Sequence, residues 1–147
     1  MKNIFKLLFA SLFVVNFSCH DSENVIDGVL DYETGAILRT ISIDKSTNDL
    51  SGCDEIIKKK DGKPLNYSLR FHLYTGLTVV KTIGGNSVLI QLSKNKSLIF
   101  TIKNESILIE KSIFLGGNKI LDNTCLTISG NLVNKDKTIH WEIRKNI

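Results

Sequence analysis

Apolar and polar residues alternate along most of the chain after residue 66. In residues 67–74 (YSLRFHLY) almost every second residue is apolar, and the residues between are polar. The pattern recurs in residues 87–92 (SVLIQL), 97–103 (SLIFTIK), 125–133 (CLTISGNLV) and 137–145 (KTIHWEIRK). A period of two with many β-branched residues indicates strands with one buried and one solvated face. The pattern therefore predicts a β-rich domain.

The segments between these runs are short and rich in Gly, Asn and Lys, at residues 75–76, 84–86, 94–96, 103–105, 116–118 and 134–136. Connections of this length join antiparallel neighbours, because a parallel crossover needs about a dozen residues or more. Strand centres recur about every ten residues, which is typical of β-barrels and β-sandwiches.

Upstream of this region, residues 36–43 (AILRTISI) form a first strand candidate, and residues 44–55 (DKSTNDLSGCDE) have turn composition. The sequence thus predicts a single β-domain over residues 36–147. Its fold class is all-β, an antiparallel meander that forms a small up-and-down barrel or a sandwich of about seven or eight strands.

The N-terminus combines a basic start with a short apolar run. Lys2 and Lys6 flank the beginning of residues 7–15 (LLFASLFVV). This run is shorter than the roughly 20 residues of a membrane-spanning helix but has the length of a signal-peptide core. We predict that residues 1–18 are a signal peptide. The alternative is a buried N-terminal helix of a cytosolic protein.

Asn16-Phe17-Ser18-Cys19 stands where the cleavage site is expected. This stretch resembles the lipobox of bacterial envelope lipoproteins, which signal peptidase II cuts before the cysteine. The resemblance implies that Cys19 is the lipidation site and holds the protein to the membrane. It also implies an outer-membrane location, periplasmic or surface-exposed. The segment that follows is polar and acidic, so we predict that residues 19–35 form a flexible tether.

Charge is unevenly distributed along the chain. Loss of Lys2 and Lys6 with the signal would lower the formal net charge from +4 to +2, which argues against a nucleic-acid partner. Residues 19–55 hold nine acidic and two basic residues, and residues 56–147 hold six acidic and fifteen basic residues. Either the basic part attracts an anionic partner such as an acidic glycan, or it is a solvated, lysine-rich surface.

Two cysteines, Cys53 and Cys125, remain after Cys19. A pair of cysteines outside the cytoplasm can form a disulfide, and we predict that these two do. The alternative is one thiol in a loop and one packed as a small hydrophobic side chain. No cysteine spacing such as C-x2-C points to a metal site.

No catalytic motif stands out. His20, His72 and His140 belong to no H-E-x-x-H metal motif, and the chain has no G-x-S-x-G stretch. Glu105, Glu110 and Glu142 would act as general acids only if a cleft brought two carboxyl groups together. We therefore predict that the protein is not an enzyme and uses no cofactor.

Phe71, Phe100 and Trp141 fall on the apolar faces of their strands. Core packing is the simplest role, and the alternative is the lining of a ligand cavity. Residues 127–147 (TISGNLVNKDKTIHWEIRKNI) resemble the closing hairpin of small lipocalin-like bacterial lipoproteins. That resemblance implies a cup for a small apolar ligand.

The sequence as a whole predicts a lipid-anchored cell-envelope protein whose β-domain binds or interacts without catalysis. Its partner would be an envelope protein, a glycan or a small apolar ligand. The first alternative is a lipocalin-like carrier, and the second is a secreted hydrolase with an unrecognised site.

Overall fold

A computed structural model describes residues 26–31, 35–59, 63–116 and 119–146. In these ranges the chain forms ten strands and no helix: β1 (Ile26–Asp31), β2 (Gly35–Ile43), β3 (Leu50–Lys58), β4 (Leu65–His72), β5 (Thr78–Lys81), β6 (Ser87–Ser93), β7 (Lys96–Ile102), β8 (Leu108–Gly116), β9 (Lys119–Leu132) and β10 (Lys137–Asn146). The predictions for residues 1–18, for Cys19 and for His20 concern residues outside the described ranges.

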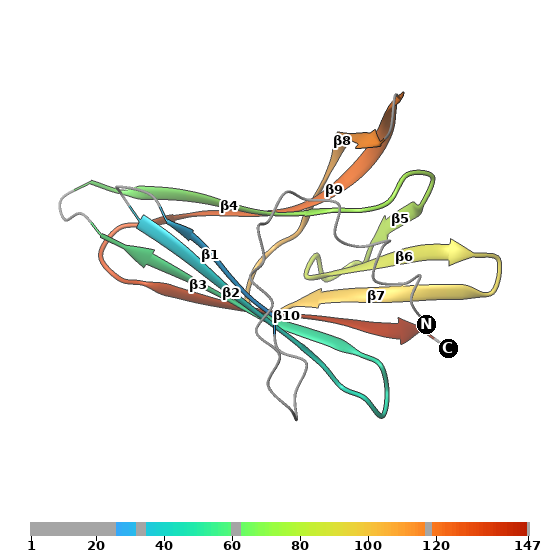
Figure 1. The fold of residues 1–147 in the computed structure, drawn as a ribbon, viewed down its shortest axis with the longest axis horizontal. Coiled ribbons are helices and arrows are strands. Elements are labelled where there is room, and N and C mark those ends of the chain that lie inside the picture. Colours follow the sequence, from blue (N-terminus) through green and yellow to red (C-terminus); the bar gives the residue numbers. More distant parts are fainter. Residues whose placement is uncertain (1–25, 32–34, 60–62, 117–118, 147) are drawn as a thin grey trace.

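The strands form two antiparallel sheets that pack face to face (Figure 1). The large sheet has the order β1-β2-β3-β10-β7-β6-β5, and the small sheet has the order β4-β9-β8. The predicted all-β antiparallel fold is confirmed, in its sandwich form. The domain also begins earlier than predicted, because β1 lies in the segment expected to be a tether and pairs with β2.

The meander is interrupted rather than continuous. β1-β2-β3 and β5-β6-β7 are each a meander, and β10 lies between β3 and β7 and joins them into one sheet. β4, β8 and β9 leave the large sheet to build the small one. An alternating pattern marks each strand but does not identify its neighbours, which explains why the sequence did not predict this order.

The segment predicted as a turn, residues 44–55, is a short turn followed by a strand. Asn48 adopts a positive φ of 59°, and its amide donates a hydrogen bond of 2.7 Å to the carbonyl of Asp44. β3 then begins at Leu50 and runs in register with β2 from Ile43↔Leu50 to Gly35↔Lys58. Cys53 is therefore a strand residue rather than a loop residue.

The core lies between the two sheets, where the apolar residues of each alternating strand meet. In β10, for example, Ile139, Trp141 and Ile143 are buried while His140 and Arg144 are exposed. The apolar residues with the least exposure are Ile56, Val88, Ile90, Ile102, Ile107, Leu126 and Ile128.

Phe71, Phe100 and Trp141 form the aromatic centre of this core. The Phe71 ring centroid lies 4.9 Å from that of Phe100 and 5.1 Å from that of Trp141, and the last two stack at 6.0 Å. Offset and edge-to-face contacts at these distances are favourable. The three rings pack on one another, as the core-packing interpretation requires, instead of surrounding a ligand.

Candidate functional site

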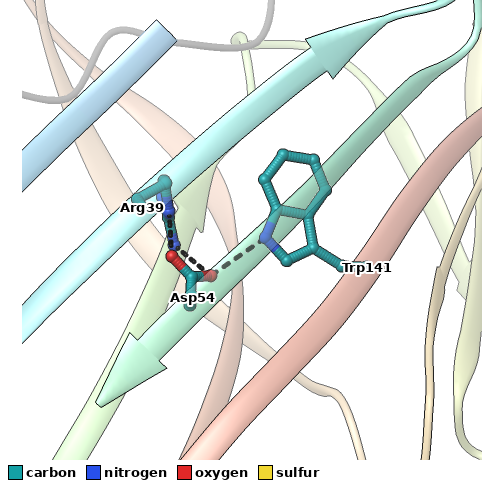
Figure 2. Close-up of polar contacts among 3 residues, drawn as sticks. All are labelled: Arg39, Asp54 and Trp141. Atoms are coloured by element: carbon teal, nitrogen blue, oxygen red, sulfur yellow. Dashed lines mark hydrogen bonds and ion pairs between the residues drawn. The ribbon is translucent and has the colours of Figure 1, made fainter. Parts of the chain in front are cut away.

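A buried polar network joins three adjacent strands of the large sheet at its inner face. Asp54 of β3 accepts hydrogen bonds from Nε of Arg39 at 2.5 Å, from Nη2 of Arg39 at 3.0 Å and from Nε1 of Trp141 at 2.9 Å (Figure 2). Asp54 is 0% exposed, and Arg39 is 8% exposed. A buried charge pair needs good geometry and further hydrogen bonds to offset desolvation, and this carboxylate has both.

The network also connects the two sheets. The guanidinium carbon of Arg39 lies 4.5 Å from the ring centroid of Phe71, which belongs to β4 of the small sheet. Such a cation–π contact is attractive when it is desolvated. Arg39, Asp54 and Trp141 therefore fix β2, β3 and β10 relative to one another and to the small sheet. Arg39 and Asp54 lie too deep to meet a large ligand.

On the other side of these strands, the outer face of the large sheet carries a shallow groove of about 300 Å³. We call it the outer groove. Two neighbouring cross-strand rows of polar side chains line it. The registers align Thr40, Cys53 and His140 in the first row and Ser42, Ser51, Glu142 and Thr101 in the second. The ladder continues from His140 to Lys103, whose amide donates to the His140 carbonyl at 3.2 Å.

Strand alternation explains why these residues face outward. In β2, β3 and β10 the neighbours along the chain, such as Arg39, Asp54 and Trp141, point into the core, so the residues between them point to solvent. His140, Ser51 and Lys103 are exposed, whereas the other polar residues of the rows are half-buried. The second row continues to β6, where Ser87 Oγ lies 3.1 Å from Thr101 Oγ1.

The charged side chains that line the outer groove are Lys103 and Glu142. The carboxylate of Glu142 pairs with Arg144 Nη2 at 2.7 Å, which leaves the ammonium of Lys103 as the remaining charge among these three groups. Burial raises the pKa of the Cys53 thiol, and the nearby carboxylates of Glu55 and Asp54 raise it further. Cys53 is therefore a neutral thiol in this groove rather than a nucleophilic thiolate.

Chemically, the outer groove offers hydroxyl groups, an imidazole and a cation on a shallow surface. Such groups can bind hydroxyl and anionic groups of an extended ligand. Of these residues, His140, Cys53, Trp141 and Glu142 could be singled out from the sequence. The hydroxyl residues could be seen on the polar faces of residues 36–43 and 97–103, but their adjacency depends on the strand order.

The other histidine singled out from the sequence lies on the small sheet. His72 Nδ1 is 3.0 Å from Ser112 Oγ, and neither residue borders the outer groove. Nearby, Thr127 Oγ1 donates to Glu110 Oε2 at 2.5 Å. The two predicted histidines are therefore in different sheets and do not form a common site.

The predicted disulfide between Cys53 and Cys125 is not formed, because both thiols are free. Cys53 faces outward from β3 of the large sheet. Cys125 lies in β9 of the small sheet, on the face opposite Leu126 and Ile128, which are in the core. Packed sheets are about 10 Å apart, and a disulfide needs Cα atoms within about 7 Å. The two thiols point away from each other across the sandwich.

Within the described ranges, no three or more His, Cys, Asp or Glu side chains gather in a way that could hold a metal ion. The same part of the chain contains no helix with the length and apolar character needed to cross a membrane.

Solved structures of a heparan sulfate lyase and of heparinase III share this fold. The heparan sulfate lyase HepC of Pedobacter heparinus matches with a TM-score of 0.72 and 14% identity, over 89% of this chain and 21% of the lyase. Two heparinase III structures match with TM-scores of 0.68 and 0.58 and identities of 13% and 17%. These two matches cover 95% and 89% of this chain, and 22% and 20% of the matched heparinase chains. The chain thus spans about a fifth of the length of these enzymes.

No curated protein matches the chain. A family model does match, over residues 17–142, and its description is Heparinase II/III-like, C-terminal. This family is different from the lipocalin-like lipoproteins that the closing hairpin resembles. The match extends over nearly all of the described strands, so the chain belongs to the Heparinase II/III-like, C-terminal family.

Proposed function

We propose that this domain binds an acidic polysaccharide of the heparan sulfate type in its outer groove, without cleaving it. The observation that carries the proposal is the pair of polar rows beside Lys103 and His140, on a domain of a heparinase family. Heparan sulfate appears in the name of a structural relative, and it has the hydroxyl and anionic groups that these rows can bind.

The shape of the outer groove supports a linear ligand. The rows run across strands β2, β3 and β10 to β7, and neighbouring strands lie about 4.8 Å apart. This spacing is comparable to the length of one sugar ring, so successive sugars would meet successive strands. The Lys103 ammonium would pair with a sulfate or carboxylate, and the hydroxyl side chains would exchange hydrogen bonds with sugar hydroxyls.

The proposal of a non-catalytic module rests on the chemistry of the groove. General acid–base catalysis needs a base within hydrogen-bond reach of the proton that it removes, and usually a partner that orients it. Glu142, the carboxylate that lines the groove, is paired with Arg144, and the Cys53 thiol is neutral. The matched structures are about five times longer than this chain, so their lyase activity belongs to much larger proteins.

We further propose that acylated Cys19 anchors the domain in the outer membrane of a bacterial envelope. The support is the Asn16–Cys19 lipobox behind the short apolar run. Two or more acyl chains make membrane attachment stable, because each buried CH2 contributes about 0.8 kcal/mol. An anchored module of this kind would hold polysaccharide at the cell surface.

Titration of the purified chain with heparan sulfate, heparin and uncharged dextran tests the binding proposal. We expect the sulfated polymers to bind, and the Lys103→Ala and His140→Ala variants to bind them more weakly. Lys94→Ala, at the opposite end of β7 from Lys103, is the charge-matched control and should bind like the unmodified chain. Equal weakening by Lys94→Ala would mean unspecific charge attraction, and formation of unsaturated uronate products would overturn the non-catalytic part.

A further inference from the structure

A second hollow, also of about 300 Å³, lies far from the outer groove, where β8 and β9 meet the residues that follow β4. In Figure 1 the free end of the β8–β9 hairpin projects beyond the rest of the sandwich. The hollow is lined by Gly76, Lys111, Ser112, Asp122, Asn123 and Thr124. Its volume is at the lower end of the range of about 300 to 1,000 Å³ for small-molecule sites.

Asn123 is the unusual residue in this hollow. It is 8% exposed, and within the described residues neither its amide nitrogen nor its amide oxygen has a hydrogen-bond partner. A buried polar group without a partner costs about 1–3 kcal/mol, so such groups are rare in folded proteins. By contrast, Asn131 in the same strand donates to Asn66 Oδ1 at 2.7 Å. A ligand with both donors and acceptors would satisfy the Asn123 amide.

The surroundings of Asn123 restrict the chemistry of that ligand. Lys111 and Asp122 contribute one positive and one negative charge to the lining, so the hollow favours an uncharged ligand. The Asn123 amide lies opposite Ser112 in the β8–β9 ladder, and the Ser112 hydroxyl also lies 3.0 Å from His72 Nδ1, so donors and acceptors stand close together on this face. Two adjacent hydroxyl groups on a sugar ring would both donate hydrogen bonds to these groups and accept hydrogen bonds from them.

An aromatic pair lies close along the chain to residues that line the hollow. Tyr74, two residues before Gly76, and Phe114, two residues after Ser112, have ring centroids 5.7 Å apart, and Tyr74 is 43% exposed. The Leu73 amide donates to the Thr124 carbonyl at 2.9 Å, which holds the chain before Tyr74 against β9. Exposed aromatic rings can pack against the apolar face of a sugar ring.

We propose that this hollow binds a single neutral sugar residue, with the Asn123 amide bonded to two adjacent hydroxyl groups. It is a binding site separate from the outer groove, with a different ligand charge. The two sites lie on different sheets, so one polysaccharide chain and one neutral sugar can bind independently.

Saturation-transfer NMR with glucose, galactose, N-acetylglucosamine and glucuronate tests this inference on the purified chain. At least one neutral sugar should receive saturation, and glucuronate should receive less. The Asn123→Leu variant should bind that sugar at least about tenfold more weakly, since it loses hydrogen bonds to the ligand. Asn131→Ala is the matched control in the same strand and should bind it with unchanged affinity.

A second measurement separates a binding role from a structural one. Replacing an unpartnered buried amide with an apolar side chain of similar shape should leave the melting temperature of Asn123→Leu unchanged or raise it. A lowered melting temperature, binding unaffected by Asn123→Leu, or no signal from the neutral sugars would overturn the inference. Heparin binding is measured separately, so these outcomes do not decide whether the outer groove binds polysaccharide.

Discussion

Trp141 lies directly opposite Gly52 in the β10–β3 ladder, and its indole covers the position where a side chain of residue 52 would begin. A Cβ atom at Gly52 would stand 2.1 Å from Cζ2 of Trp141. The small sheet repeats the arrangement, because Tyr67 lies opposite Gly130 and a Cβ there would stand 2.4 Å from the Tyr67 hydroxyl. In each sheet a glycine thus makes room for an aromatic ring.

We predict that Gly52→Ala destabilises the domain by about 1–3 kcal/mol, the usual cost of overpacking a core. Trp141 would have to move, and the floor of the outer groove would move with it, so heparan sulfate binding should weaken as well. Urea denaturation followed by Trp141 fluorescence measures the loss. Gly84→Ala is the control, since its new Cβ would meet only the Asn86 side chain at 3.2 Å. Equal stability of the two variants would contradict the prediction.

The Asp54 network provides a test of buried electrostatics. Asp54→Ala removes the carboxylate of the buried Arg39–Asp54 ion pair, and removal of one member of a buried pair typically costs about 3–5 kcal/mol. The double change Arg39→Met with Asp54→Leu removes both charges and should cost less than Asp54→Ala alone. Denaturant unfolding of the two variants decides. A double variant that is as unstable as the single one would contradict this account.

Several features of the fold could be predicted from the sequence because they depend on local pattern. Alternation in residues 67–74 and 137–145 corresponds to β4 and β10, and the burial of Trp141 follows from its place on the apolar face. The partners of these strands could not be predicted. β10 pairs with β3 and β7, which are distant in sequence, and strand pairing at that distance leaves no local signal.

The candidate site shows the same limit. His140 is visible as a polar-face residue, but its neighbours Thr40 and Cys53 come from other strands, and Lys103 follows β7. Cys53 was assigned to a turn because residues 44–55 are rich in Asp, Ser, Asn and Gly. Only residues 44–49 form the turn. Residues 50–55 belong to β3, because pairing with β2 outweighs their turn-like composition.

Asp44 makes the β2–β3 turn sensitive to acid. Hydrogen bonds from the Ser46 hydroxyl and amide, with a further one from the Thr47 amide, lower the pKa of its carboxyl below 3.8. Because the pKa of this carboxyl is lower in the folded state, its ionised form stabilises the turn at pH values above the unfolded-state pKa. This stabilisation is lost as the pH falls through the folded-state pKa. We expect the Ser46 amide resonance to shift in NMR spectra below pH 3.8. Asp44→Asn should remove this transition, and an unchanged Ser46 shift across the acid range would refute the assignment.

Cys19 provides the test of the anchor. If its thiol is acylated, Cys19→Ala should move the protein from the membrane fraction to the soluble periplasmic or extracellular fraction, because no acyl chain would then hold it. Mass spectrometry of the purified protein should show the added lipid and Cys19 as its first residue. Cys53→Ala is the control and should stay in the membrane fraction. An unmodified mass, or unchanged partition of Cys19→Ala, would rule out the anchor.

The two remaining thiols differ in accessibility, and this difference tests the structure directly. Cys53 is half-buried, whereas Cys125 is 3% exposed, and burial raises the pKa of both thiols above 9.0. We expect two free thiols in the unreduced protein, with Cys53 alkylated slowly in the native state and Cys125 alkylated only on unfolding.

The raised pKa values of the two thiols also give the stability of the domain a pH dependence of definite sign. Unfolded thiols ionise near pH 9.0, while the folded ones keep their protons to higher pH. The unfolded state therefore binds fewer protons in that range, and stability should fall as the pH rises above 9. Cys125→Ala should lessen this fall.

Alkylation followed by peptide mass spectrometry locates each modified thiol. A peptide that links Cys53 to Cys125, or equal native reactivity of the two, would show that the cysteines do not lie on opposite faces of the sandwich.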